Sequence, residues 1–436
     1  MRKSLLVSAA FAALMSPGAA FAQTLEEALT MAYQSNPTIG AERARQQATK
    51  ELKAQAWASA LPQVQGSANY TKLDQTQSFN QTVFGQTVVT ERQFNLDSRG
   101  AQISGEQAIF TGLRNFNAIR AAKARVKAGD AQLALVEQDV LQRAAQSYFD
   151  IVRDMEVYDA TKNNVDVLLR QKREAELRFE VGEVTKTDVA QADARLAQSR
   201  AQLTTAQARL AVSRASFTEI IGQTPATLET DPALPPAPSS LEEALSVAAQ
   251  GSPALVRARM AEEASRRNVA VAKGAFAPTV SLTASYQYAE EPNSFINNDE
   301  QFAYGVRASV PIFLGGLNIS RMREARALHE ADRRRIEEAE RRATAAVTAS
   351  WEQLSAARAN IVSATSQVDA NQLALTGVRR EAQLGTRTTL DVLDAEQEYL
   401  NAQVALANAE RDARSATFQL LAAMGVLGPD TGEDGS

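Results

Sequence analysis

Two aspartates three residues apart, Asp391 and Asp394, are the side chains of this sequence best placed to do chemistry. They lie in the segment LGTRTTLDVLDAEQEYL, residues 384–400. Residues at positions i and i+3 of a helix share one face, so both carboxylates would point the same way. Carboxylates held close together repel, raise one another's pKa and attract cations. The simpler alternative is a solvated helix face that carries two acidic side chains.

The same segment belongs to a turn that occurs twice, 203 residues apart, and the turn offers Asp391 a structural role. The Gly-x-x-Thr-x-x-Asp pattern consists of Gly182, Thr185 and Asp188 in the first copy and Gly385, Thr388 and Asp391 in the second. A glycine just past a helix end favours the left-handed conformation that ends the helix. A threonine followed three residues later by an acidic residue forms a capping box at the start of the next helix. Asp394 has no such role, and the first copy has Gln191 in its place.

The remaining inventory leaves little for an enzyme to use. The chain has no cysteine and a single histidine, His329, which lies in the charged run EARALHEADRRR and is expected to be solvated. The motifs G-x-S-x-G, G-x-x-x-x-G-K and H-E-x-x-H are absent from the sequence. We therefore expect no enzyme, no cofactor and no metal site. The formal net charge of −5 makes nucleic acid a poor partner.

Residues 1–22 are typical of a secretory signal peptide. Arg2 and Lys3 precede the apolar run LLVSAAFAALM, and Ala20-Phe21-Ala22 fits an A-x-A cleavage site. A transmembrane anchor is the weaker alternative, because the apolar run is shorter than about 18 residues. An exported chain without cysteine has no disulfides and no lipidated N-terminal cysteine.

The rest of the chain is a duplication. TLEEALTMAYQSNPTI (24–39) matches SLEEALSVAAQGSPAL (240–255), and IFTGLRN (109–115) matches IFLGGLN (312–318). The offset falls from 216 to 203 between these matches, so we expect a longer loop in the first copy. The predicted parts are a signal peptide (1–22), a first repeat (23–222), a Pro-rich linker (223–239), a second repeat (240–424) and a disordered tail (425–436).

Each repeat carries the same predicted elements. It opens with a helix of about 35 residues. The capping boxes of these opening helices are Thr24 with Glu27 and Ser240 with Glu243. Two strands follow, and then a helix without proline, from about 113 to 180 and from about 317 to 384. A rod of about 100 Å cannot be buried within one globular domain. The closing helices repeat small and large apolar residues every 3.5 positions, which is typical of a left-handed coiled coil.

Two of the predicted strands alternate apolar and polar residues. VSLTASYQY (280–288) and FAYGVRASVPI (302–312) follow the pattern of transmembrane β-strands, with a soluble hairpin as the alternative. VQGSANYTKL is a weaker version in the first repeat, and segment 92–110 is assigned as a strand mainly from the duplication. Four strands cannot close a barrel, and an open edge cannot lie in lipid. Either the strands are soluble, or several chains pool them.

The chain resembles the TolC family of outer-membrane efflux proteins. The resemblance rests on the repeated helix–strand–strand–helix–helix halves, the LEEAL openings, IF-x-G-G after a strand, and GTRTTLDVLDAEQEYLNAQ. It implies a mainly α homotrimer with a small β part. Twelve strands would form one transmembrane β-barrel in the outer membrane lipid of a Gram-negative cell, continuous with a periplasmic α-barrel of twelve helices. It also implies a periplasmic adaptor and an inner-membrane transporter as partners, in a channel for drug efflux or type I protein secretion.

The resemblance also assigns roles at the periplasmic turns. Asp391 and Asp394 would line a narrow entrance as a selectivity ring. Arg387 would hold the entrance shut by bonding to Thr187 and Asp188 of the first turn. A tyrosine that supports closure in the best-known member corresponds here to Ala382.

Two other classes share some of these features. A periplasmic adaptor also has a signal peptide and a long helical hairpin, but it needs more short strands than the four found here. A trimeric adhesin has one helix per chain and a C-terminal anchor, whereas these strands lie in the middle of each repeat.

Overall fold

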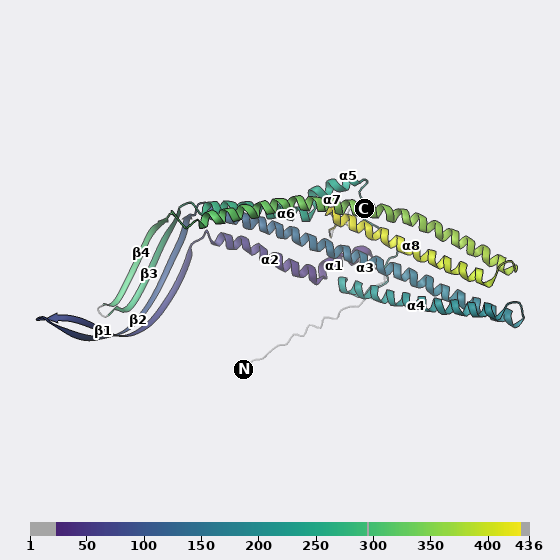
Figure 1. The fold of residues 1–436 in the computed structure, drawn as a ribbon, viewed down its shortest axis with the longest axis horizontal. Coiled ribbons are helices and arrows are strands. Elements are labelled where there is room, and N and C mark those ends of the chain that lie inside the picture. The colour runs from purple at the N-terminus through teal and green to yellow at the C-terminus, as the bar shows by residue number, and fades with distance from the viewer. Residues whose placement is uncertain (1–22, 294–295, 429–436) are drawn as a thin grey trace, which may run out of the picture. The chain divides into compact units, whose positions relative to one another are not determined.

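The computed structural model describes residues 23–293 and 296–428, so the predicted signal peptide and the tail from 429 lie outside the described residues. The first repeat contains α1 (Leu25–Ser35), α2 (Pro37–Ala58), β1 (Gln63–Val83), β2 (Gln86–Phe110), α3 (Arg114–Glu180) and α4 (Lys186–Ile221). The second contains α5 (Leu241–Gly251), α6 (Pro253–Gly274), β3 (Thr279–Asn293), β4 (Ile296–Ser309), α7 (Leu317–Gln383) and α8 (Thr389–Met424) (Figure 1). The same order of elements occurs twice, which confirms the internal duplication.

The opening helix of each repeat is broken in two, so the predicted single helix was wrong. The breaks fall at Asn36 and Ser252, each immediately before a proline. Proline disfavours the helical conformation in the residue before it, and the two residues have ψ values of 124° and 118°. After the first break, the Asn36 side chain accepts a hydrogen bond from the Thr38 N–H at 2.8 Å and so starts α2.

The predicted capping boxes at these openings are only partly repeated. Thr24 and Glu27 form the complete reciprocal pair. In the second repeat the Ser240 hydroxyl accepts from the Glu243 N–H at 3.2 Å, but the Glu243 carboxylate accepts from the Ser239 N–H at 2.8 Å. The return bond of the second box is therefore shifted by one residue.

The strands form one antiparallel sheet in the order β1-β2-β3-β4, in which the pairing of β2 with β3 joins the two repeats (Figure 1). The longer loop predicted in the first repeat is instead longer strand. β1 and β2 pair all the way to Val83↔Gln86, and Phe84 and Gly85 turn with φ of 50° and 83°. Two central residues with positive φ make the type I′ turn whose twist suits an antiparallel ribbon. At the other end, β4 stops at Ser309, two residues short of Pro311.

The β4 strand exposes a row of large apolar side chains. Phe302, Tyr304 and Val306 alternate along the strand and are 67%, 82% and 69% exposed. Alternate residues of a strand share one face, so these side chains form a single apolar surface. An apolar surface of this kind is typical of a face that meets lipid or another chain.

The chain divides into two compact units that each draw on both repeats. Within the described residues, unit 1 comprises 23–40, 137–248 and 346–428, and unit 2 comprises 41–136, 249–293 and 296–345. Helices α3 and α7 contribute to both units. The sheet belongs to unit 2, and the turns that end α3 and α7 belong to unit 1.

Aromatic residues fill the core of unit 1. Tyr148 and Phe149 of α3 are fully buried, as are Phe217 of α4 and Phe418 of α8. The rings of Phe149 and Phe418 lie 5.8 Å apart between centroids, so the two repeats share this core. The Tyr148 hydroxyl lies 3.0 Å from the Gln23 carbonyl oxygen, and burial raises the pKa of Tyr148 to about 12.

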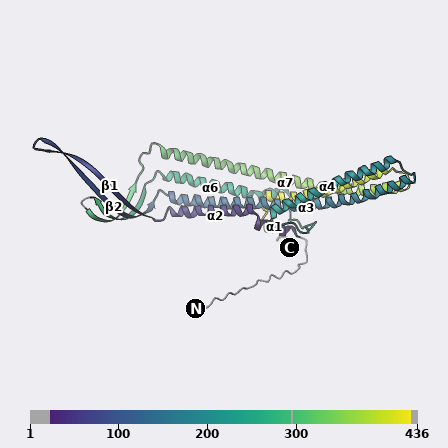
Figure 2. The ribbon, with the colours of Figure 1, turned by 90° about the horizontal axis from the view of Figure 1, so that it is seen from below.

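The predicted coiled-coil seam is well matched in α4 and less well in α8. The predicted α4 seam was Val189, Ala192, Leu196, Ser199, Leu203, Ala206, Leu210, Ser213, Phe217 and Ile220. The residues buried there are Ala192, Leu196, Ser199, Ala206, Leu210, Ser213, Phe217 and Ile221. In α8, Leu393, Glu396 and Leu400 are buried beside the predicted Val392 and Ala402. Helix α8 therefore buries two faces, and α4 is one of its close neighbours (Figure 2).

Unit 2 contains the single histidine, His329, which was predicted to be solvated but is only partly exposed. His329 Nε2 lies 2.7 Å from Glu262 Oε1, and the two side chains are 25% and 19% exposed. They join α7 to α6. The charged run around His329 predicted a helix, but it could not show that α6 packs against the face of α7 that carries His329.

No group of three or more His, Cys, Asp or Glu side chains within the described residues is arranged to hold a metal ion. Among the described helices, none combines the length and the apolar character needed to cross a membrane.

Candidate functional site

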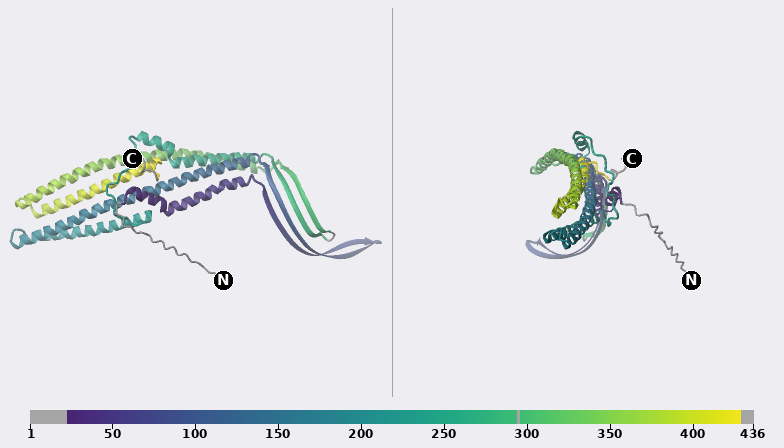
Figure 3. Two further views of the ribbon diagram at one scale, coloured as in Figure 1. Left: turned by 180° about the vertical axis from the view of Figure 1, so that it is seen from behind. Right: turned by 90° about the vertical axis from the view of Figure 1, so that its right-hand side faces the viewer.

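The two predicted turns of unit 1 connect α3 to α4 and α7 to α8, so that each pair runs side by side as a hairpin (Figure 3). Gly182 and Gly385 end the long helices with φ of 84° and 78°, as predicted. At both turns the residue after the glycine donates its N–H to the carbonyl four residues before the glycine, at 2.9 Å from Glu183 and 3.0 Å from Thr386. This is the Schellman arrangement, which gives unsatisfied helix-end carbonyls a partner.

The capping boxes after both turns form as predicted. Asp188 accepts from the Thr185 N–H at 2.8 Å, and Asp391 accepts from the Thr388 N–H at 2.9 Å. The threonine hydroxyls accept in return from the aspartate N–H groups at 3.3 and 3.2 Å. The hydrogen bonds that each carboxylate accepts from the threonine backbone and hydroxyl lower its pKa below the ordinary 3.8. These hydrogen bonds therefore favour the ionised form of Asp391, which caps and stabilises its own helix.

Asp394 contacts the other hairpin. Its Oδ1 lies 2.5 Å from Nη2 of Arg195 on α4. The Asp394 side chain is 52% exposed and that of Arg195 is 32% exposed. The carboxylates predicted to act together at an entrance thus have different partners in the chain, because one caps α8 and the other pairs with α4.

Arg387 lies in the second turn, where its Nε donates to Glu381 Oε2 at 2.9 Å. Both side chains are half exposed. The hydrogen bond from Arg387 to Glu381, and then the charges of Glu381 and Asp391, raise the pKa of Arg387. The structure does not bring Arg387 to Thr187 or to Asp188, whose carboxylate is engaged in its own capping box.

A buried carboxylate that the sequence did not single out, Glu396, lies two residues past Asp394 on α8. Glu396 is 4% exposed and accepts from Arg379 Nε of α7 at 2.8 Å, and from Nη2 of the same guanidinium. Gln171 of α3 approaches the same oxygen at 3.5 Å. This cluster therefore connects α8 to its own hairpin partner and to the first hairpin.

A cavity of about 130 Å³ lies beside this cluster. Its wall includes Ala175 and Arg178 of α3, Ala382 of α7 and Val392 of α8. Ala382 is the position at which the resemblance implied a missing tyrosine. The small alanine borders an open space between the two hairpins.

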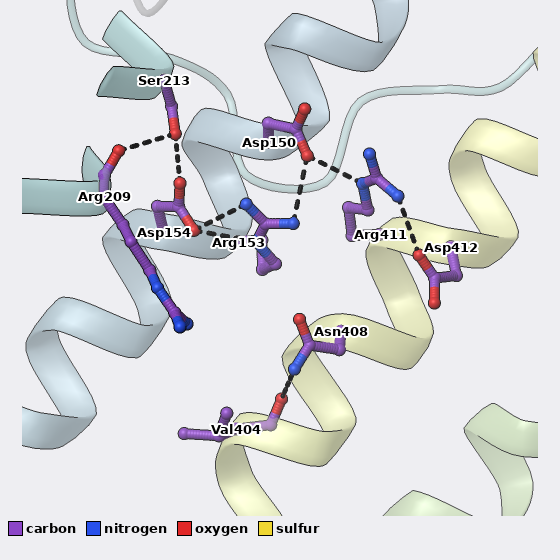
Figure 4. A network of polar contacts seen from close by, with 9 residues as sticks. All are labelled: Asp150, Arg153, Asp154, Arg209, Ser213, Val404, Asn408, Arg411 and Asp412. Carbon is purple, nitrogen blue, oxygen red and sulfur yellow. Dashed lines mark hydrogen bonds and ion pairs between the residues drawn. The ribbon is translucent and has the colours of Figure 1, made fainter. Parts of the chain in front are cut away.

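A third polar connection lies closer to the aromatic core (Figure 4). Arg411 of α8 donates to Asp150 of α3 at 2.8 Å, and Arg153 bridges Asp150 and Asp154 at 3.1 and 2.8 Å. The Ser213 hydroxyl of α4 donates to the other oxygen of Asp154. Charged side chains thus connect the two hairpins at three successive levels, and any relative movement of the hairpins must break or rearrange these contacts.

These contacts could not be read directly from the sequence, because their partners are 199 to 261 residues apart. One signal was available: Glu396 interrupts the apolar face of α8 that buries Leu393 and Leu400. A polar residue at an otherwise apolar contact position usually has a partner of opposite charge.

Comparison with known proteins places this geometry in a family. The model of a family described as "Outer membrane efflux protein" matches residues 28–223 and 244–426, most of both repeats. The outer membrane efflux protein BepC of Brucella suis is 30% identical over 413 residues, which cover 94% of this chain and 87% of BepC. The outer membrane protein TolC of Vibrio cholerae is 27% identical over 432 residues, which cover 97% of this chain and 95% of that protein.

The fold matches a solved structure over nearly its whole length. The crystal structure of the outer membrane protein VceC from Vibrio cholerae is similar with a TM-score of 0.77 and 22% identity, and the match covers 92% of this chain and 96% of VceC. The predicted fold class is confirmed, as is the predicted location in the outer membrane. These matches argue against the adaptor and adhesin alternatives. The chain belongs to the outer membrane efflux protein family.

Proposed function

We propose that three copies of this chain form the outer-membrane exit channel of an export system. The observation that carries the proposal is the sheet, which has two open edges, at β1 and β4, and exposes large apolar side chains on β4. An open edge cannot lie in lipid, whereas twelve strands pooled from three chains close a barrel. The four long helices of each chain, α3, α4, α7 and α8, would surround a water-filled bore in the same trimer.

The partners and cargo follow from the same proposal. A periplasmic adaptor would contact the helical part, and an inner-membrane transporter would supply substrates. The name of the relative BepC supports efflux. Type I protein secretion is the second cargo class that such a channel would serve.

The assembly is tested by fractionating membranes and running the protein on gels with and without boiling. A trimer that dissociates on heating and is found in the outer-membrane fraction supports the channel. A monomer outside the membrane fraction contradicts it. Deleting the gene, and then measuring drug sensitivity and the secreted proteins, separates the two cargo classes.

We further propose that Asp391 and Asp394 of three chains form the selectivity ring at the periplasmic entrance. Six carboxylates around a narrow opening would bind multivalent cations from the periplasmic side. Changing Asp391→Asn together with Asp394→Asn is expected to abolish the block of single channels by divalent or trivalent cations in planar bilayers. Glu330→Gln with Glu337→Gln is the matched control, because it removes two exposed charges from α7 far from the turn. Block that persists in the aspartate variant would remove the ring.

The proposed latch is a contact from Arg387 to Thr187 and Asp188 in the closed channel. Arg387 would have to leave Glu381, which is feasible because an ion pair between half-exposed side chains contributes little. Arg387→Ala is expected to raise single-channel conductance severalfold in planar bilayers, whereas Arg380→Ala, its control on α7, leaves conductance unchanged. Glu381→Gln distinguishes the two partners. It should lower conductance if Arg387 binds the first turn, and raise it if the pair with Glu381 is what keeps the entrance closed.

A further inference from the structure

Arg195 is the cation that the structure adds to the proposed entrance. Its Nη2 lies 2.5 Å from Asp394 Oδ1, and its Nη1 donates to Gln198 of its own helix at 3.4 Å. The contact joins α4 of the first repeat to α8 of the second. Both side chains keep a substantial exposed fraction, so ions in solution can reach the carboxylate.

The duplication makes this ion pair one-sided. The first repeat has Gln191 where the second has Asp394, and the second repeat has Glu398 where the first has Arg195. A symmetric pair of hairpins would form this contact twice, whereas each chain here has the residues for it once. One arginine per chain therefore faces one of the two carboxylates assigned to the ring.

The exposure of the pair indicates what Arg195 does. Exposed ion pairs contribute little to stability, so this contact alone does not hold the hairpins together. A guanidinium at hydrogen-bond distance nonetheless cancels most of the field of a carboxylate for an ion farther away. Asp391 instead accepts from the Thr388 N–H, and the cation whose charge acts on it is Arg387 of its own turn rather than a residue of α4.

We propose that Arg195 is a specificity-determining residue of the entrance. While the hairpins are together, Arg195 compensates the charge of Asp394, and the ring attracts cations mainly through Asp391. When the hairpins separate, Asp394 loses its partner and the ring gains three negative charges per trimer. Cation attraction is thereby coupled to opening. The inference rests on the proposed entrance ring.

The test is the block of single channels by hexaamminecobalt(III), a trivalent cation, in planar bilayers. Arg195→Gln is expected to tighten the block about ten-fold at 0.1 M salt, because three compensating charges are removed from a site that a trivalent ion occupies. Arg195→Lys keeps the positive charge, so the cation should block this variant as strongly as it blocks the unmodified channel. A change in stability alone would not move the blocking constant in this way.

Two further variants keep the inference distinct from the ring on which it rests. In Arg195→Gln combined with Asp394→Asn the ten-fold gain should disappear. If Asp391→Asn with Asp394→Asn leaves the block unchanged, the ring itself is wrong and the inference falls with it. If that variant loses the block while Arg195→Gln leaves it as it was, the ring stands and the role of Arg195 is overturned.

Discussion

Replacing Arg379 by alanine is expected to loosen the turn end of the α7–α8 hairpin by about 2 kcal/mol, because it leaves the Glu396 carboxylate buried without a cation. The loss of one partner of a fully buried ion pair costs about 3–5 kcal/mol. The smaller value applies here because the Arg379 side chain is 43% exposed, so water can replace part of it. Backbone amides around Glu396 should exchange hydrogen for deuterium about thirty-fold faster, as measured by mass spectrometry of peptides from α8.

Two variants separate the buried charge from a general effect of removing an arginine. Arg380→Ala removes the exposed neighbouring arginine of α7 and should leave exchange unchanged. Glu396→Gln added to Arg379→Ala should restore much of the protection, because a neutral amide needs no cation and can still accept from Gln171. Equal exchange in Arg379→Ala and the unmodified protein would mean that Glu396 is solvated and the connection is unimportant.

The local features of this chain could be predicted from the sequence because their causes lie within a few residues. The glycines at 182 and 385 end the long helices, and Thr185 and Thr388 start the next ones, through contacts that span at most five residues. The long helices start and end within one residue of the predicted limits, since nothing in them competes with helix formation. The helix breaks at Asn36 and Ser252 also have a local cause, because each is followed directly by a proline. They could therefore have been predicted from the sequence.

Features that depend on distant partners could not be predicted in the same way. Arg195 and Arg379 look like ordinary helix-surface arginines until the hairpins are packed together. His329 looks solvated until α6 covers it. The 13 extra residues of the first repeat look like a loop, because a polar strand that pairs only with its neighbour lacks the apolar alternation from which strands are recognised.

A contact between two glycine backbones in unit 2 is another feature of this kind. Gly112 follows β2, and Gly274 is the last residue of α6. A Cβ atom on Gly112 would collide with the Gly274 carbonyl oxygen and the Ala277 methyl, and one on Gly274 would collide with the Gly112 carbonyl oxygen. Neither backbone can move aside as a flexible side chain would. The connection between the strand and α3 is therefore fixed against the end of α6.

Gly112→Ala is accordingly expected to destabilise the protein by about 3–4 kcal/mol, which combines overpacking with the cost of an alanine in the left-handed region. The duplication supplies a matched control in Gly315, which corresponds to Gly112 and has φ of 60° against 64°, but whose added Cβ would meet nothing within 4 Å. Gly315→Ala should therefore cost only the conformational strain, about 1–2 kcal/mol. Gly274→Ala tests the same contact from the other side, because Gly274 does not have a positive φ. The first repeat already has an alanine, Ala58, at the corresponding position. The temperature at which the assembled protein dissociates on unboiled gels should fall far more for Gly112→Ala and Gly274→Ala than for Gly315→Ala. Equal, small shifts in all three would show that the two backbones can separate without cost, and that the strand-to-helix connection is not held there.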